Sequence, residues 1–162
     1  MKHYDQQDLD EMIVCPKLIT GLPRKEMRLE RGSFRNAFDL ESIGNKTRFS
    51  VFMRRNERFP ENFSIGLAVY PKDEYEKCFL FRCNGPHGDH VNDLLNHDPH
   101  FGFHIHKAKA GDIENGLAPE HYAELTESYG SYEEALTHFL KWIKAENADQ
   151  YFDIQRQLRL FP

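Results

Sequence analysis

Apolar and polar residues alternate through the middle of the chain with the period of two that is typical of half-buried β-strands. The alternation is partial over residues 34–40 and clear over 49–53 and 63–69. Further strands are predicted at 78–83 and 101–106, and every second residue of the latter is apolar. Such strands usually pair in antiparallel order, with one face on a core and the other toward water.

The spacing of apolar residues becomes helical near both ends of the chain. It predicts a short helix from Asp5 to about Val14, which Pro16 ends. After Gly130, apolar residues recur at steps of three and four, and Ser131 with a glutamate three residues later forms a capping-box pattern. Two helices are therefore expected to flank the strands.

Two segments near the C-terminus leave alternatives open. Residues 120–129 suit a helix that follows Pro119, but Tyr122 to Thr126 would also serve as a strand. The tail 151–161 has apolar residues at helical spacing, so it is either a last packed helix or a partner-binding segment. We interpret it as packed, because amphipathic stripes usually cover the core of their own domain.

Runs of strands followed by helices predict an α+β fold. We expect an antiparallel sheet of about five or six strands, with an N-terminal helix and C-terminal helices packed on it. The length of 162 residues is close to the commonest size of one domain, so residues 1–162 are predicted to form a single domain. Hydrophobic residues make up 40% of the chain, which is sufficient for a core and unlike a disordered composition.

The composition also bears on location. No apolar run reaches the roughly 18 residues of a membrane span, and the first eight residues are acidic where a signal peptide would be basic and then apolar. We therefore expect a cytoplasmic protein with no membrane partner. Cys15, Cys78 and Cys83 form neither an even disulfide framework nor a C-x-x-C pair, so reduced thiols are expected.

The net charge of −5 is unevenly distributed along the chain. Residues 23–60 hold ten basic and five acidic side chains, whereas residues 112–162 hold four basic and ten acidic ones. The basic block is either a solvated sheet face interleaved with acids or an anion-attracting band, which would suit RNA or a nucleotide as a partner. The acidic C-terminal region would suit docking onto a basic protein partner.

Six of the nine histidines are concentrated in one stretch, namely His87, His90, His97, His100, His104 and His106. His104 and His106 share one face of the last predicted strand, because strand residues two apart point the same way. His87 and His90 lie on the loop that leaves the preceding strand. This loop would fold over the His104–His106 pair if the two strands are neighbours in the sheet.

Such a cluster suits acid–base chemistry on a phosphodiester. One imidazole would remove the proton of an RNA 2′-hydroxyl and another would protonate the leaving oxygen, since a pKa of about 6.5 populates both forms near neutrality. His104 and His106 are the first candidates for acid and base, and His87 and His90 have second catalytic or positioning roles. This chemistry requires no cofactor.

Three other residues near the histidines are candidates for the site. Arg82 or Lys107 would stabilise the charged intermediate of that reaction. Cys83, on the opposite face of its strand from Cys78, is a candidate thiolate ligand or nucleophile, although a free cysteine more often acts as a small buried apolar residue.

Two other interpretations of the cluster remain open. In one, His87, His90, His104 and His106 ligate Zn²⁺ or another late transition metal, although the H-E-x-x-H, C-x-x-C and H-x-E patterns of known zinc sites are absent. In the other, the histidines are surface and core residues of a non-catalytic binding module, such as an antitoxin, an inhibitor or a defence-associated adaptor.

Two motifs carry a resemblance to known proteins. Asn84-Gly85-Pro86-His87 and, later, His104-Ile105-His106 resemble the N-G-P-H…H-x-H signature of a group of small uncharacterised bacterial proteins, over roughly residues 78–140. More distantly, the arrangement resembles the TumE-type toxins of toxin–antitoxin pairs. The resemblance implies a small intracellular bacterial protein, and a toxin-like endoribonuclease is the leading functional hypothesis.

Overall fold

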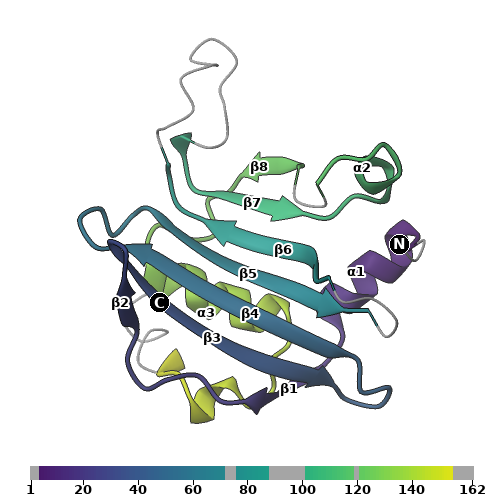
Figure 1. The fold of residues 1–162 in the computed structure, drawn as a ribbon, viewed down its shortest axis with the longest axis horizontal. Coiled ribbons are helices and arrows are strands. Elements are labelled where there is room, and N and C mark those ends of the chain that lie inside the picture. The colour runs from purple at the N-terminus through teal and green to yellow at the C-terminus, as the bar shows by residue number, and fades with distance from the viewer. Residues whose placement is uncertain (1–3, 72–75, 88–100, 119–120, 155–162) are drawn as a thin grey trace.

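A computed structural model describes residues 4–71, 76–87, 101–118 and 121–154 of the chain (Figure 1). The elements in chain order are α1 (Gln6–Val14), β1 (Lys17–Gly21), β2 (Arg28–Glu30), β3 (Ser33–Ser42), β4 (Arg48–Asn56), β5 (Phe63–Tyr70), β6 (Cys78–Asn84), β7 (His104–Lys107), α2 (Ala110–Glu114), β8 (Ala123–Leu125) and α3 (Tyr132–Trp142), followed by a 3-10 turn at Ala148–Gln150. Strands followed by a packed helix make this an α+β fold, as the sequence predicts.

The strands form one antiparallel sheet in the order β1-β3-β4-β5-β6-β7-β8, and β2 pairs with the first residues of β3. Eight strands are more than the predicted five or six. The additional strands are β1 and β2, which are five and three residues long and therefore too short to show a clear period of two. The ambiguous segment 120–129 contributes a strand, β8.

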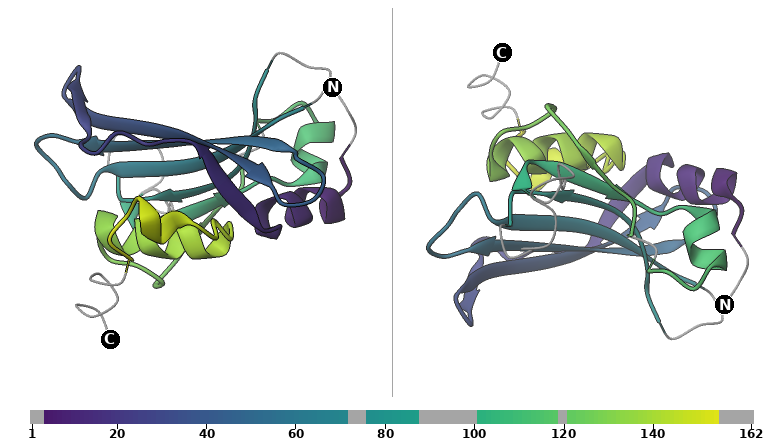
Figure 2. Two further views of the ribbon diagram at one scale, coloured as in Figure 1. Left: turned by 90° about the horizontal axis from the view of Figure 1, so that it is seen from below. Right: turned by 90° about the horizontal axis from the view of Figure 1, so that it is seen from above.

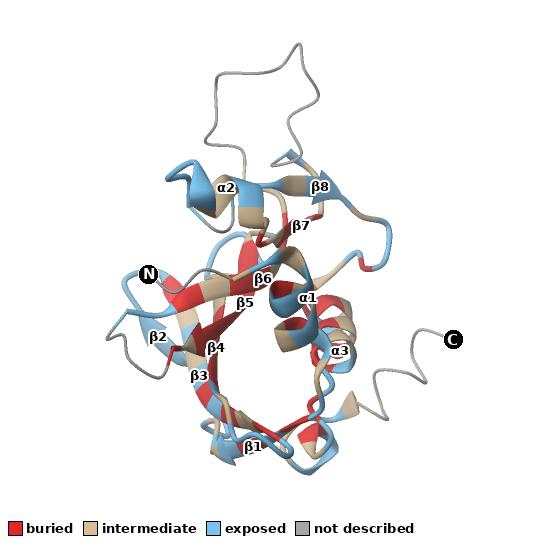
Figure 3. Cartoon of the chain, turned by 90° about the vertical axis from the view of Figure 1, so that its right-hand side faces the viewer, coloured by how far each residue is buried: buried red, intermediate tan, exposed pale blue. Residues whose placement is uncertain are grey.

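Among the described residues, the two main helices cover one and the same face of the sheet. Figure 2 shows α1 and α3 on that side, where α3 packs mainly on β5 and β6 and α1 mainly on β6. Figure 3 shows the buried segments of the central strands and α3 in red. The fully enclosed apolar side chains of this core include Leu9, Phe49, Phe63, Ile65, Leu67, Phe139 and Ile143. The opposite side, called the open face here, therefore carries the residues that alternate with the core.

Capping residues set the first turn of both main helices. Asp5 accepts a hydrogen bond from the backbone of Asp8 at 2.8 Å and begins α1 where the sequence predicts it. Ser131 accepts one from the backbone of Glu134 at 3.1 Å, which confirms the predicted start of α3. The Glu134 carboxylate accepts from the Gly130 N–H at 2.9 Å, one residue before the cap.

A buried lysine joins the ends of these two helices. The Lys17 Nζ donates to the carbonyls of Ile13 and Cys15 at 2.8 Å and to that of Ile143 at 2.9 Å. Carbonyls at helix ends have no partner within the helix, so the ammonium group satisfies the C-terminal ends of α1 and α3 together. It also lies 4.8 Å from the centre of the Phe49 ring. Lys17 is therefore a structural residue.

An irregularity in β6 changes which residues share a face. The pairing of β5 with β6 shifts register between Leu67 and Ala68, so Phe79 and not Leu80 lies opposite Ala68. A bulge of this kind reverses the alternation of side chains. Cys78 and Cys83 consequently face the same side, paired with Val69 and Ile65, and the expectation of opposite faces is wrong.

The tail continues past α3 against the core. Phe152 lies 5.5 Å from Phe38 between ring centres, and Ile154 is partly buried. Residues 155–161 of the predicted tail helix lie outside the described residues. Within the described part of the chain, none of the helices combines the length and the apolar composition needed to cross a membrane.

Candidate active site on the open face of the sheet

Polar side chains from three adjacent strands meet on the open face. Ser64 of β5 lies opposite Asn84 of β6, which lies opposite His104 of β7. Two residues further along the same face of β6 and β7, Arg82 lies opposite His106. Since directly paired residues project from the same face, the antiparallel register brings all five side chains together.

Hydrogen bonds fix the orientation of the His104 ring. Its Nδ1 lies 2.8 Å from the carbonyl of Gly102, which can only accept, so Nδ1 carries a proton. The Ser64 hydroxyl donates to Asn84 Oδ1 at 2.6 Å, and Asn84 Nδ2 lies 3.4 Å from His104 Nε2. A rotated Asn84 amide would instead accept from a protonated Nε2 and donate to Ser64, so the network suits both protonation states.

A tyrosine on the core side holds the backbone of this site. The Tyr129 hydroxyl lies 2.9 Å from the carbonyl of Asn84 and 2.7 Å from that of His104, and it shares its proton between them. Burial raises the pKa of Tyr129 above its ordinary value, so the phenol stays protonated as a donor. It therefore links β6 to β7 at Asn84 and His104, two residues of the candidate site.

The three histidines of the cluster that lie in the described residues are His87, His104 and His106, and the ring of His104 contacts the other two. The ring centres of His87 and His104 are 5.0 Å apart, and those of His104 and His106 are also 5.0 Å apart. His104 is completely enclosed and His106 is 7% exposed, whereas His87, on the loop after β6, is half-buried. The pairing of β6 with β7 thus brings His87 beside the strand pair, as the sequence hypothesis requires.

The Arg82 guanidinium packs against two neighbouring aromatic rings on the same face. Its guanidinium lies 4.6 Å from the centre of the Phe79 ring and 5.1 Å from that of Phe52. Phe79 and Arg82 are three residues apart and would point to opposite faces of a regular strand, so the bulge in β6 makes this arrangement possible. Gly66 lies opposite both Phe52 and Arg82 and leaves room for the Phe52 ring.

A depression of about 650 Å³ opens beside these residues. Its walls combine basic, amide, hydroxyl and aromatic groups, namely Phe52, Arg54, Asn56, Asn62, Ser64, Phe79, Arg82, Asn84 and His87. His87 is thus the histidine of the cluster that lines the depression, while His104 and His106 lie opposite two of its lining residues, Asn84 and Arg82, in the sheet. The mixture of imidazole and guanidinium groups suits an anion that exchanges protons.

Sequence patterns did not single out several of these residues. Asn62 and Ser64 look like ordinary loop and outward-facing residues, and Tyr129 looks like a core aromatic. Arg54 belongs to the basic block of residues 23–60, which the sequence offers as either a solvated face or an anion-attracting band. The signal that could have found Ser64 is its outward position on β5. Asn84 belongs to the motif that resembles the signature of a group of small bacterial proteins. The residues Asn84-Gly85-Pro86 by themselves predict only a turn.

Other candidate residues have different surroundings. Cys83 faces the core, and burial raises its pKa well above the ordinary value, so it is a neutral thiol away from the depression. Lys107 forms an ion pair with Asp10 at 3.3 Å. His90, His97 and His100 lie outside the described residues. Among the described residues, no group of three His, Cys, Asp or Glu side chains is arranged to hold a metal ion.

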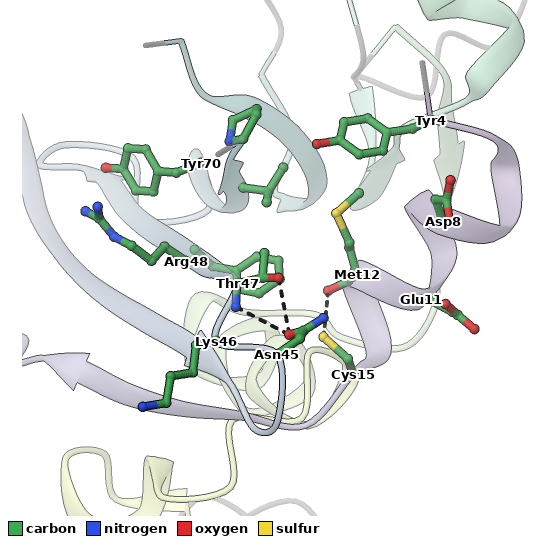
Figure 4. Close-up of a pocket in the computed structure, with 13 residues that line it drawn as sticks. Tyr4, Asp8, Glu11, Met12, Cys15, Asn45, Lys46, Thr47, Arg48 and Tyr70 are labelled. Atoms are coloured by element: carbon green, nitrogen blue, oxygen red, sulfur yellow. Dashed lines mark hydrogen bonds between the residues drawn. The ribbon is translucent and has the colours of Figure 1, made fainter. Parts of the chain in front are cut away.

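A second cavity of about 650 Å³ lies between α1 and the turn that joins β3 to β4 (Figure 4). Its walls carry both signs of charge, with Asp8 and Glu11 on α1 and Lys46 and Arg48 beside the turn. The Asn45 side chain there accepts hydrogen bonds from the Thr47 backbone and hydroxyl, at 3.3 and 3.2 Å. Its polar groups hold the turn and do not converge on an anion.

Comparisons with known proteins give no further assignment: no protein-family model, no curated protein and no solved structure matches the chain significantly. The resemblance to the bacterial signature group and to TumE-type toxins therefore stays a prediction.

Proposed function

We propose that the depression on the open face handles a phosphodiester and that the chain is a small endoribonuclease. The observation that carries the proposal is the row of three touching imidazoles that reaches a depression lined by Arg54 and Arg82. Histidines supply proton transfer near neutral pH, and the guanidinium groups supply charge stabilisation for a phosphate. The proposal requires no metal ion.

In the proposed reaction, His87 acts as the general base, because it lines the depression and is the most exposed of the three imidazoles. It accepts the proton of an RNA 2′-hydroxyl as the 2′-oxygen bonds to phosphorus. The bond from phosphorus to the 5′-oxygen breaks, and that oxygen takes a proton from His106. The products are a 2′,3′-cyclic phosphate and a free 5′-hydroxyl. Arg82 and Arg54 stabilise the added negative charge.

His104 is a positioning residue in this scheme. It is fully enclosed and contacts both of the other rings at 5.0 Å between ring centres. Its own orientation is set by Gly102 and Asn84. In the proposed site it therefore fixes the distance between the general base and the general acid.

The test is cleavage of a mixed-sequence RNA pool by the full chain in EDTA, with detection of 2′,3′-cyclic phosphate ends. We expect cleavage by the wild type, and a loss of about 100-fold or more in rate for His87→Ala and for His106→Ala. His104→Ala should lose most of the activity and change the shape of the pH–rate profile. His121→Ala removes an exposed imidazole elsewhere and should leave the rate unchanged.

Three outcomes would contradict the proposal. Full activity in both His87→Ala and His106→Ala would place the chemistry elsewhere. Cleavage that appears only after Zn²⁺ or Mn²⁺ is added would favour the metal interpretation of the histidine cluster. Cleavage of a substrate that lacks the 2′-hydroxyl at the scissile position would exclude attack by that oxygen.

A further inference from the structure

Three arginines lie in one row across the open face, next to the proposed site. Arg28 of β2 pairs with Arg35 of β3, and Arg35 pairs with Arg54 of β4. Arg54 then pairs with Ser64, from which the same row continues through Asn84 to His104. A row of directly opposed residues on one face is therefore basic at one end and carries the imidazoles at the other.

Like charges directly opposite each other destabilise a sheet, so this row needs an explanation. Within the described part of the chain, Arg28 forms an ion pair with Glu30 at 3.3 Å, but neither Arg35 nor Arg54 forms one with a carboxylate. The Arg54 guanidinium donates a hydrogen bond to the Asn62 amide oxygen at 2.9 Å. Burial and the charges of Arg35 and Arg82 lower the pKa of Arg54 below its ordinary value. A bound polyanion would relieve this repulsion.

The exposure of the row changes in a consistent direction. Arg28 and Arg35 are exposed, Arg54 is half-buried, and Ser64, Asn84 and His104 are buried. Four strand spacings separate β3 from β7, which is about 19 Å at about 4.8 Å per spacing. The row is thus long enough for several phosphates of one strand, and it descends from the surface toward the imidazoles.

We propose that this arginine row binds the backbone of a single-stranded RNA and leads it into the depression, an inference that rests on the proposed function. Single strands are bound where a basic track lies beside aromatic rings that can stack on unpaired bases, and the half-buried ring of Phe52 borders the row. A long duplex is disfavoured by the net charge of −5, because duplex affinity depends on overall neutralisation by basic residues. The substrate is therefore a chain of several nucleotides.

Binding can be measured separately from cleavage with 2′-O-methyl oligonucleotides, which lack the attacking hydroxyl. We expect Kd to fall as the length rises from two to eight nucleotides. Arg35→Gln and Arg54→Gln should each weaken binding of the eight-mer roughly tenfold, the effect of one lost charge-assisted hydrogen bond. Each should also lower the slope of log K against log salt by roughly 0.7. Arg54→Lys keeps the charge and should keep the slope.

Arg48→Gln is the matched control. It removes the same charge from the same face of β4, but Arg48 lies opposite Glu41 and outside the row. It should leave Kd and the salt slope unchanged, and melting curves of all variants will show that they fold. Equal Kd values for the dinucleotide and the eight-mer, or an eight-base-pair duplex that binds as tightly as the single strand, would overturn the proposal.

The two proposals fail in different ways. A chain that cleaves RNA but binds the eight-mer without dependence on Arg35 and Arg54 would overturn the arginine row and leave the catalytic site intact. A chain that binds with the expected arginine dependence but never cleaves RNA would overturn the endoribonuclease and leave the single-strand track intact.

Discussion

Gly66 decides where Arg82 can lie. A Cβ atom at this position would clash with Phe52, 2.7 Å from its Cζ and closer still to its Cε1. Only the absence of a side chain lets the Phe52 ring pass over β5 and contact the Arg82 guanidinium. A residue that contributes no functional group thus positions the cation of the proposed site.

Gly66→Ala should lower kcat/KM for RNA about tenfold and the free energy of unfolding by about 1–3 kcal/mol, because the overpacked Phe52 ring must turn away from Arg82. Urea unfolding and cleavage rates measure the two effects. In a Phe52→Ala background the same substitution should have little further effect on activity.

Gly111→Ala is the control, since nothing lies within 4 Å of a Cβ added there. Unchanged activity in Gly66→Ala would show that the contact of Phe52 with Arg82 does not position the guanidinium.

The two main helices are joined to the sheet through one charged side chain. Lys17 at the start of β1 donates to the carbonyl of Ile13 at the end of α1 and to that of Ile143 at the end of α3, and Ile143 lies 126 residues from Lys17 in sequence. Desolvation by burial is the largest influence on its ammonium group and lowers the pKa of Lys17 from 10.5 to about 8. The packing of both helices is therefore linked to the titration of a single group.

Between pH 8 and 10.5 the unfolded chain keeps the Lys17 proton while the folded chain releases it. The folded state binds fewer protons in that window, so the contribution of Lys17 to stability rises with pH. Lys17→Met leaves three carbonyls without their donor. It should lower the free energy of unfolding by about 3 kcal/mol at pH 7.

The difference in unfolding free energy between wild type and Lys17→Met, measured in urea at several pH values, should grow across this window. Other lysines and tyrosines titrate in both proteins and cancel in the difference. A difference that stays flat or shrinks would mean that the three carbonyls keep the buried ammonium charged.

The two faces of the sheet carry different kinds of residue. Helices α1 and α3 pack on the apolar face, and the other face carries the arginine row, Arg82 with its two aromatic neighbours, and the histidines. Opposed like charges are expected to lower the stability of the sheet at the arginine row. Binding sites commonly accept such a cost, since stability above the level needed for folding gives no added function.

Arg35→Gln should therefore stabilise the free protein by about 0.5 kcal/mol at low salt while it weakens RNA binding. The gain should disappear near 1 M salt, where charges on the surface are screened within about 3 Å. Arg48→Gln should instead lower the stability of the free protein, because Arg48 lies opposite Glu41 and attracts it. A loss of stability in Arg35→Gln would show that the arginine row does not repel itself.

Periodicity was sufficient to predict the α+β class, both main helices and most strands, because burial on one face imposes a period of two or 3.6 directly on the residues. The prediction that His104 and His106 share a face rested on the same kind of local pattern, since residues two apart along one strand point the same way. The prediction that Cys78 and Cys83 face opposite sides of the strand was wrong, because it assumed strict alternation. A single bulge reverses the alternation and leaves no periodic signal in the sequence.

The sequence by itself determined which faces are apolar, where α1 and α3 begin, and that a histidine pair shares one face of a strand. Only the tertiary structure decided which strands are neighbours. The row from Arg28 to His104 and the contact of His87 with His104 depend on pairing between segments distant in sequence, and Arg82 meets two rings through a bulge and a glycine. Such contacts depend on which strands pair and on a bulge in β6, and the alternation of residues along a single strand shows neither.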